Sequence, residues 1–402
     1  MIIFLNRRET ISSTGIPLAP TRRAVSLVAA LTLVLLAVHA AAAAEGPFRF
    51  REGRYGQAEL KYRDGLPVLT VQGTPEEMGQ QQAALVADAA QAVLDYPKDI
   101  ARVFNRPDEV PALLEKGLAL VPQIPPHHLA ELEAFARHAR IDRKVLLGTN
   151  TMVDSYRGRF GCSSLLVEPS RSATGGTLLA RNLDFYSNGV LEQRSLVTVF
   201  RPQGKRAFVS IGFPGMIGCL SGMNDAGLAL AVHEVFFSRD KAPMFNPKGV
   251  PYMLLFRRIL EECRTVAEAE RLLASVERTT LYNLALADRQ GVAVAEVTPR
   301  TIVVRRAESG LCACTNEFRS EALATMFRFS LRQIVLMQSH RMASLGVADL
   351  ARKMHQVSQG WLTMQTMVFE PGPLRIHLAM GKCPSSALPL APLELGPLLT
   401  GK

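Results

Sequence analysis

The chain has 402 residues, of which 48% are hydrophobic, and a formal net charge of +10 at pH 7. This length is enough for a large core and for one or two domains. The basic residues are spread along the chain apart from doublets such as Arg257-Arg258, and Trp361 is the single tryptophan. Because no basic stripe interleaved with aromatic residues is present, the composition argues against nucleic-acid binding and favours a basic surface suited to anionic substrates or membranes.

Residues 1–44 are typical of a targeting segment. An apolar run from Ala24 to Ala44 ends in a series of alanines, and it is preceded by four arginines: Arg7, Arg8, Arg22 and Arg23. A basic start, an apolar run and an Ala-x-Ala-type exit predict a secretory signal peptide. A membrane anchor retained at residues 24–44 is the alternative, since the run is near the lower limit for a spanning helix. Either interpretation predicts that the rest of the chain is exported, to the periplasm or the extracellular space.

Residues 45–161 are predicted to be mainly helical after a short strand at 68–71. Thr74 and Glu77 have the spacing of a capping box, with proline at the first helical position. Apolar residues then recur at helical spacing as far as Tyr96. Prolines near position 125 predict a turn, and further helices are expected at 127–138 and 142–155.

From Cys162 onwards the hydrophobic period changes to that of strands. Strands are predicted at 163–168, 177–182, 195–200, 206–211 and 227–232, followed by helices at 251–263 and 265–276. Four more strands are predicted at 282–287, 292–297, 301–305 and 311–315, then helices at 328–340 and 347–356, and a closing hairpin at 364–369 and 374–380. This order predicts two antiparallel sheets with helices outside them. The proline- and leucine-rich tail from Pro384 is expected to wrap the surface.

The segment with the most chemical information is Gly161-Cys162, at the start of a predicted strand. Arg181 and Asp184 lie on the next predicted strand. If the Gly161–Cys162 bond is cut, Cys162 becomes an amino-terminal nucleophile beside a cation and a carboxylate. The alternative is a buried structural cysteine next to an ordinary Arg–Asp ion pair, because free cysteine is often buried.

The other cysteines and histidines do not form a recognisable metal or disulfide pattern. The six cysteines lack the density of a disulfide scaffold, although an exported protein could still form a bridge. Cys312 and Cys314 occupy alternate strand positions, so their side chains are expected on the same face. His233-Glu234 begins like a zinc-protease motif, but the second histidine is missing.

Several motifs in order resemble the isopenicillin-N acyltransferase-like family of autoproteolytic N-terminal-nucleophile hydrolases, related to penicillin V acylase, bile-salt hydrolase and acid ceramidase. The similarity covers most of the predicted exported chain, and its order and spacing are more specific than any one fragment. The fragments are Gly73-Thr74-Pro75-Glu76-Glu77-Met78-Gly79, Gly161-Cys162-Ser163-Ser164, Arg181-Asn182-Leu183-Asp184, Gly222-Met223-Asn224-Asp225-Ala226-Gly227-Leu228, Thr315-Asn316-Glu317-Phe318 and Ser330-Leu331-Arg332.

The resemblance implies an α+β fold, a four-layer αββα sandwich with a mainly helical pro-segment. It implies three parts: the signal peptide at 1–44, a pro-segment or small chain at 45–161, and a catalytic domain at 162–402. It further implies self-cleavage between Gly161 and Cys162, catalytic roles for Cys162, Arg181, Asp184 and Asn316, and no cofactor or metal.

Substrate-binding positions are expected at His233, Glu234 and Arg332. In bile-salt hydrolase relatives, an asparagine near the end of the central hairpin helps to hold the oxyanion. Here His233 or Glu234 takes that place, and a carboxylate cannot donate a hydrogen bond unless it is protonated. The second oxyanion donor therefore stays unassigned.

These residue types suit acyl transfer without a catalytic histidine. The α-amino group of Cys162 has a reference pKa of about 7.7–8, so it can accept the thiol proton near neutral pH. Asp184 is expected to hold this amine, and the charge of Arg181 is expected to lower the thiol pKa. The side-chain NH₂ of Asn316 can donate to the oxyanion. Glycine at 161 is expected because it tolerates strained backbone and crowds the attack least.

We therefore expect an exported amidase or acyltransferase whose partners are a small-molecule N-acyl amide substrate and its own pro-segment after cleavage. No nucleic-acid partner is expected, and membrane association is expected if the anchor is retained. The alternatives are a non-catalytic ligand-binding relative on the same scaffold, and a lipid amidase or phospholipase-B-like lipase.

Overall fold

The computed structural model describes residues 48–155, 161–325 and 330–401, which belong to one unit, Phe48–Lys402. The predicted signal peptide at 1–44 and the first positions of the helix predicted at 328–340 lie outside the described residues. The strands are β1 (Gly53–Tyr55), β2 (Ala58–Arg63), β3 (Leu66–Gly73), β4 (Gly161–Val167), β5 (Leu178–Asp184), β6 (Leu196–Pro202), β7 (Phe208–Gly212), β8 (Ser221–Asn224), β9 (Ala229–Glu234), β10 (Tyr282–Ala287), β11 (Val292–Val297), β12 (Ile302–Arg306), β13 (Leu311–Cys314), β14 (Thr363–Glu370), β15 (Arg375–Met380) and β16 (Ala391–Glu394).

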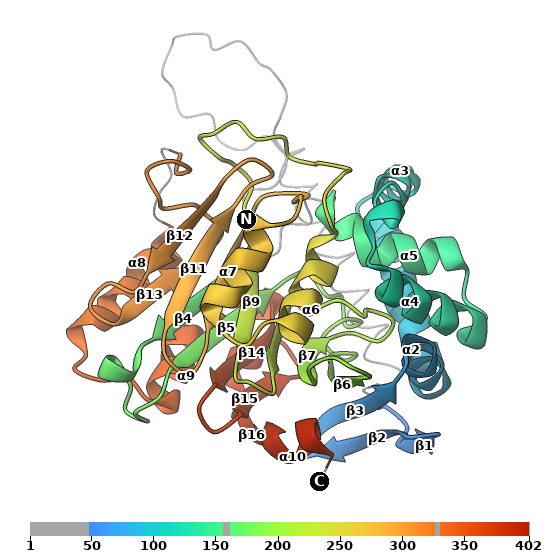
Figure 1. The fold of residues 1–402 in the computed structure, drawn as a ribbon, viewed down its shortest axis with the longest axis horizontal. Coiled ribbons are helices and arrows are strands. Elements are labelled where there is room, and N and C mark those ends of the chain that lie inside the picture. Colours follow the sequence, from blue (N-terminus) through green and yellow to red (C-terminus); the bar gives the residue numbers. More distant parts are fainter. Residues whose placement is uncertain (1–47, 156–160, 326–329, 402) are drawn as a thin grey trace, which may run out of the picture. The chain divides into compact units, whose positions relative to one another are not determined.

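The helices fall into two groups, one before the predicted cleavage site and one after it (Figure 1). Those before it are α2 (Pro75–Val103), α3 (Glu109–Leu118), α4 (Pro126–Ala139) and α5 (Arg143–Thr151). Those after it are α6 (Tyr252–Glu262), α7 (Val266–Ala274), α8 (Leu331–Met337), α9 (Val347–Gln356) and α10 (Leu395–Thr400).

The strands form two sheets. The ten-stranded sheet has the order β1-β2-β3-β6-β7-β8-β9-β10-β11-β12, and the six-stranded sheet has the order β13-β4-β5-β14-β15-β16. The strand pairs are antiparallel except for β3 with β6, which is parallel. The sequence predicted two antiparallel sheets, so this pair is a difference. A parallel pair needs a long connection, and the helices α2–α5 with the β4–β5 hairpin provide it.

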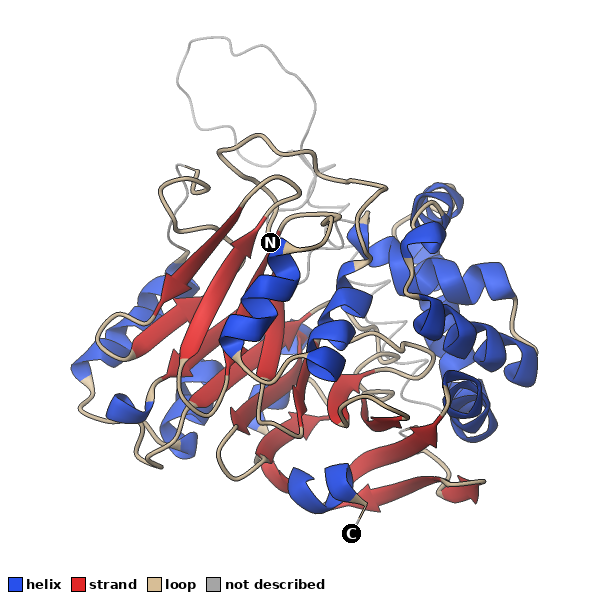
Figure 2. Cartoon of the chain, viewed as in Figure 1, coloured by secondary structure: helices blue, strands red, loops and turns tan. Residues whose placement is uncertain are grey.

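The two sheets pack face to face with helices on their outer faces, which gives four layers (Figure 2). Between the sheets lies a core that includes Leu166 of β4, Val209 of β7 and Met367 of β14. The outer face of the ten-stranded sheet packs on the first helices and on α6 and α7, while the outer face of the six-stranded sheet packs on α8 and α9. This αββα arrangement confirms the predicted fold class.

Local sequence signals explain several element boundaries. Thr74 caps α2, because its side chain accepts from the Glu77 amide while the Glu77 side chain accepts from the Thr74 amide, as the capping box predicts. The segment Asn224-Asp225-Ala226-Gly227 forms the turn between β8 and β9. Gly227 there has a positive φ of +86°, which favours glycine, and the Asn224 side chain accepts from the amides of Ala226 and Leu228.

The sequence missed some elements and misjudged the tail. The strands β1, β2 and β8 and the helix α3 were not predicted, and the first two extend the ten-stranded sheet from within residues 45–161. The tail does more than wrap the surface, because β16 pairs with β15 and α10 follows it. All six cysteines are free thiols, and Cys312 and Cys314 both face the core between the sheets. Among the described residues, none of the helices has the length and apolar character needed to cross a membrane.

Candidate active site

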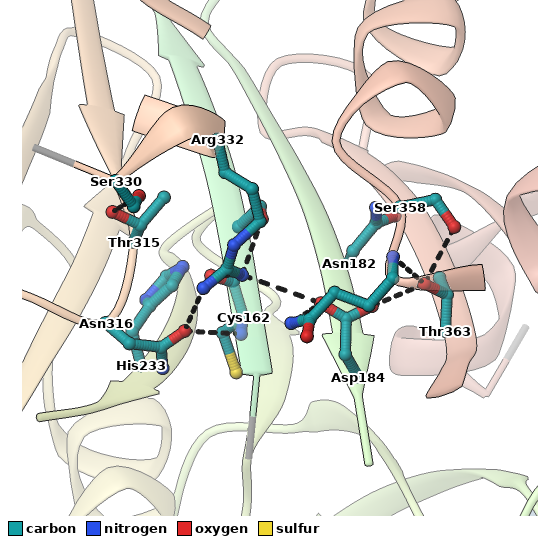
Figure 3. A network of polar contacts seen from close by, with 12 residues as sticks. Cys162, Asn182, Asp184, His233, Thr315, Asn316, Ser330, Arg332, Ser358 and Thr363 are labelled. Carbon is teal, nitrogen blue, oxygen red and sulfur yellow. Dashed lines mark hydrogen bonds and ion pairs between the residues drawn. The ribbon is translucent and has the colours of Figure 1, made fainter. Parts of the chain in front are cut away.

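Cys162 is the second residue of β4, and strand pairing places the predicted partners beside it. In the antiparallel pairing of β4 with β5, Cys162 lies opposite Leu183, and Gly161 lies opposite Asp184. Ser164 lies opposite Arg181. Because side chains alternate between the faces of a sheet, Arg181 shares the face of the thiol, and Asp184 lies on the other face. The site is therefore built around the end of one strand pair (Figure 3).

Arg181 is the charged residue that contacts the thiol. Its side chain is completely buried, and its Nη2 lies 3.6 Å from the Cys162 Sγ, while its Nη1 donates to the carbonyl of Val232. Burial raises the pKa of the Cys162 thiol, and the charge of Arg181 only partly offsets this. Arg181 therefore acts on the thiol pKa in the expected direction, but in the uncut chain desolvation of the thiolate outweighs the nearby cation.

Asn316 follows β13 and connects the start of β4 to the end of β9. Its Oδ1 accepts hydrogen bonds from the Cys162 nitrogen at 2.8 Å and from Arg332 Nη2 at 2.9 Å. Its Nδ2 donates to the carbonyl of Glu234 at 2.8 Å. The side-chain amide is thus fixed beside the nitrogen that cleavage would turn into an amine.

Arg332 lies in the first turn of α8, a helix capped by the Ser330 hydroxyl, which accepts from the amide of Gln333. Its Nη1 donates to the Cys162 carbonyl at 2.8 Å and to Ser163 Oγ at 3.1 Å, and it lies 3.7 Å from Asp184 Oδ2. Arg332, which is predicted to bind substrate, contacts the main chain of Cys162 in the uncut protein (Figure 3).

Asp184 is buried and held by two residues that the sequence did not indicate. Thr363 Oγ1 donates to its Oδ1 at 2.5 Å, and Gln359 Nε2 donates to its Oδ2 at 3.0 Å. Burial raises the pKa of the Asp184 carboxyl, and the hydrogen bonds from Thr363 and Gln359 and the charge of Arg332 oppose that shift. Thr363 and Gln359 lie at least 175 positions away along the chain, and no motif marked them.

His233 and Glu234, at the end of β9, lie close to the thiol but differ in their surroundings. His233 is buried, and its Nε2 is 2.8 Å from the Ser164 hydroxyl. Burial and the charge of Arg181 hold the pKa of His233 well below its ordinary value, so the imidazole is neutral. Glu234 lies beside Cys162 and Arg181 in a pocket wall, while its carbonyl accepts from Asn316.

The pocket beside the thiol is narrow and mostly apolar. The centre of a water-sized sphere can occupy about 10 Å³ of it, which is room for about one water molecule. Tyr282 contributes a buried hydroxyl for which the described residues provide no hydrogen-bond partner. The walls are formed by Val153, Cys162, Arg181, Leu183, Leu220, Val232, Glu234, Tyr252, Thr280, Leu281 and Tyr282.

Among the described residues, one group has side chains spaced for metal ligation, and it contains none of the predicted site residues. His127 and His128 of α4 each place Nε2 within 3.1 Å of Glu261 Oε2 on α6. Glu261 also accepts from Arg257 at 2.7 Å, and Lys205 lies 3.9 Å from it. Two adjacent cations already neutralise this carboxylate, so the group is better explained as a buried ion-pair network.

Comparison with known proteins gives one family match. Residues 171–371, half of the chain, match the family model described as acyl-coenzyme A:6-aminopenicillanic acid acyl-transferase. The matched range includes Arg181, Asp184, Asn316 and Arg332, and it begins after Cys162.

Other similarities are more distant. An uncharacterized protein of Archaeoglobus fulgidus is 22% identical over 273 residues, which cover 60% of this chain and 45% of that protein. This chain therefore spans less than half the length of that relative. A solved structure of the Caenorhabditis elegans N-acylethanolamine-hydrolyzing acid amidase ortholog is 15% identical, with a TM-score of 0.42 over 52% of this chain and 93% of that one. A variant of the conjugated bile acid hydrolase of Clostridium perfringens is 14% identical, with a TM-score of 0.42 over 58% of this chain and 92% of that one.

Proposed function

Because this chain belongs to the acyl-coenzyme A:6-aminopenicillanic acid acyl-transferase family, we propose that it hydrolyses or transfers the acyl group of a small-molecule N-acyl amide through a thioester at Cys162. The observation that carries the proposal is the environment of Cys162. The guanidinium of Arg181 lies 3.6 Å from the sulfur, and Asn316 accepts a hydrogen bond from the Cys162 nitrogen at 2.8 Å. This arrangement supports a mechanism in which the Cys162 thiol is the nucleophile and the Cys162 amine, once released, is the base.

The first reaction in this proposal is self-cleavage. The sulfur of Cys162 attacks the carbonyl carbon of Gly161, so that a C–S bond forms and the peptide C–N bond breaks. The thiol proton ends on the released amine of Cys162. Water then opens the thioester, which leaves a carboxylate on Gly161 and restores the thiol.

Turnover of an external amide repeats the same chemistry with the new amine as the base. The amine takes the thiol proton, the thiolate attacks the amide carbonyl, and the proton passes to the leaving amine as the C–N bond breaks. Water gives hydrolysis at the thioester, and a second amine gives transfer. Hydrogen-bond donors near the oxyanion stabilise the tetrahedral state, and the Asn316 NH₂ group is the proposed donor.

Cleavage also changes the electrostatics of the thiol. Burial raises the pKa of Cys162 in the uncut chain, which suits a thiol that should not react with outside molecules before maturation. Cutting gives the nucleophile a base on its own backbone, so the proton has only to pass within one residue. We further propose that the enzyme is exported, on the strength of residues 1–44, and that the small chain remains bound.

The test is expression of the full chain followed by intact mass, amino-terminal sequencing and a screen of N-acyl amides. We expect a chain that begins at Cys162, and an acyl-enzyme that hydroxylamine releases as a hydroxamate. Cys162→Ala should stay one chain and be inactive, while Cys263→Ala, which removes a thiol after α6 whose charged neighbours include none of the site residues, should be cut and active. Active protein without a chain that begins at Cys162 would rule out the mechanism.

A further inference from the structure

Gly161 is in closer contact with a distant side chain than any ordinary residue could tolerate. A Cβ placed at this position would lie 1.8 Å from Gln359 Nε2, 2.9 Å from Gln359 Cδ and 3.0 Å from Asp184 Cβ. Gly161 is the first residue of β4, where it lies opposite Asp184 of β5. The space taken by Gln359 is therefore a reason for glycine here that the sequence did not indicate.

Gln359 is held in this place by a buried carboxylate and a hydroxyl. Its Nε2 donates to Asp184 Oδ2 at 3.0 Å, and its main-chain amide donates to Thr363 Oγ1 at 2.9 Å. The same Thr363 hydroxyl donates to Asp184 Oδ1 at 2.5 Å. Moving the Gln359 side chain away would remove one of the bonds to a buried Asp184, which is costly. A clash at position 161 is thus not easily relieved by a change of rotamer.

We propose that Gln359 is a positioning and specificity-determining residue for self-cleavage. It restricts the residue before the cut to glycine, and it holds the Asp184 carboxylate beside the strand that carries the cut bond. Asp184 is the cross-strand partner of Gly161, so the side-chain amide of Gln359 contacts both of these paired residues. This inference rests on the proposed self-cleavage at Gly161–Cys162.

The contact between Gln359 and Gly161 exists only before the cut frees residue 161. Gln359 should therefore affect maturation more than turnover of an external amide. A merely structural residue would instead lower the amount of folded protein and change both rates through that amount. Comparing the rate of cutting with kcat of the cut enzyme, per active site, distinguishes these roles.

The experiment compares single and double variants of the full chain. Pulse-labelled protein is followed over time, and conversion to the chain that begins at Cys162 is measured by mass. We expect Gly161→Ala to slow cutting at least tenfold, and Gly161→Ala with Gln359→Ala to be cut several times faster than Gly161→Ala alone. Gly176→Ala is the matched control, because that glycine has open space and no positive φ, and it should be cut at the wild-type rate.

Two further variants keep the result interpretable if one protein folds poorly. Gln359→Ala alone should be cut more slowly than wild type, and its rate of cutting should fall by a larger factor than the kcat of the cut enzyme. Gly161→Val should stay uncut in both backgrounds, since Asp184 Cβ still occupies the space. The proposal is overturned if Gly161→Ala is cut at the wild-type rate, or if the double variant is no faster than Gly161→Ala. A wild-type chain that is never cut would instead overturn the proposed function.

Discussion

At the scale of single residues, the site differs from its expected form in how Asn316 is used. The sequence indicated a donor to an oxyanion, but in the uncut chain the oxygen of Asn316 accepts from the Cys162 nitrogen, and its nitrogen donates to Glu234. The two ends of one amide can therefore act in different reactions. In the proposed mechanism, the oxygen orients the nitrogen of the bond to be cut, and the NH₂ group stabilises the oxyanion during turnover.

Substitution can separate these two uses of Asn316. Asn316→Asp keeps an oxygen for Cys162 and Arg332 but loses the NH₂ donor, whereas Asn316→Ala loses both. We expect kcat to fall about 10²–10³-fold in both variants, as for other oxyanion donors. Self-cleavage should be faster in Asn316→Asp than in Asn316→Ala. Steady-state kinetics on the cut fraction and a time course of cutting measure the two effects. Unchanged turnover in Asn316→Asp would show that the NH₂ group does not act on the oxyanion.

The state of His233 allows a prediction about pH. Burial and Arg181 hold the pKa of His233 well below its ordinary value, so this histidine stays neutral near neutral pH. Protonating the Cys162 amine removes the base, so kcat/KM should fall as pH falls, with an apparent pKa of about 7–8. In His233→Gln this midpoint should not move, even where the rate changes. A midpoint near 6 that disappears in His233→Gln would identify the histidine as the base instead.

At the scale of elements, helix α6 is tied to the segment before the cut by a buried ion-pair network. Arg257 on α6 donates to Glu131 of α4 at 2.6 Å and to Glu261 at 2.7 Å, and all three side chains are buried. Gln82 of α2 donates to Glu131 as well. The network therefore joins helices on both sides of the predicted cut.

Adjacent arginines on α6 allow a matched test of this network. Arg257→Met leaves the buried Glu131 without its cation and removes one of the two cations beside Glu261, and breaking a buried pair in this way typically costs about 3–5 kcal/mol. Arg258→Met removes only a partly exposed pair with Glu262, worth about 0–1 kcal/mol. Urea unfolding in a Cys162→Ala background, at one pH and protein concentration, gives both values. Equal decreases in the free energy of unfolding of the two variants would contradict a stabilising role for the network.

How much the sequence could predict also differs from element to element. Strands β10 and β11 and helix α9 have the bounds predicted from periodicity, because their patterns are regular and bounded by turn residues. Strand β8 is four residues long and contains Gly222, and α3 contains Pro111 and Gly117, so neither had a clear pattern. Local signals describe elements, not their distant neighbours. The contacts of Asp184 with Thr363 and Gln359 depend on pairing across at least 175 positions, and no local pattern encodes them.

At the scale of the whole described unit, the segment before the cut is part of the fold and not an appendage. It supplies β1, β2 and β3 to the ten-stranded sheet and four helices to its outer face. The predicted division at residue 161 thus runs through one continuous core. Whether the chain is cut there stays a prediction, but the contacts on each side of that position do not depend on the peptide bond.

The parallel pairing of β3 with β6 has a consequence for reversibility. In the uncut chain both strands belong to one molecule, so refolding after denaturant is unimolecular. Once residues 161 and 162 are separated, the same hydrogen bonds join two polypeptides, and recovery requires them to collide. Each tenfold dilution should then lower the free energy of unfolding of the cut protein by about 1.4 kcal/mol. The free energy of unfolding of Cys162→Ala should not change on dilution. Unfolding curves recorded at several concentrations would reveal this, and identical curves for the cut protein would mean that its two pieces do not separate when it unfolds. Before cleavage, the yield of refolded protein would not depend on protein concentration. After cleavage, it would depend on the concentration of both chains.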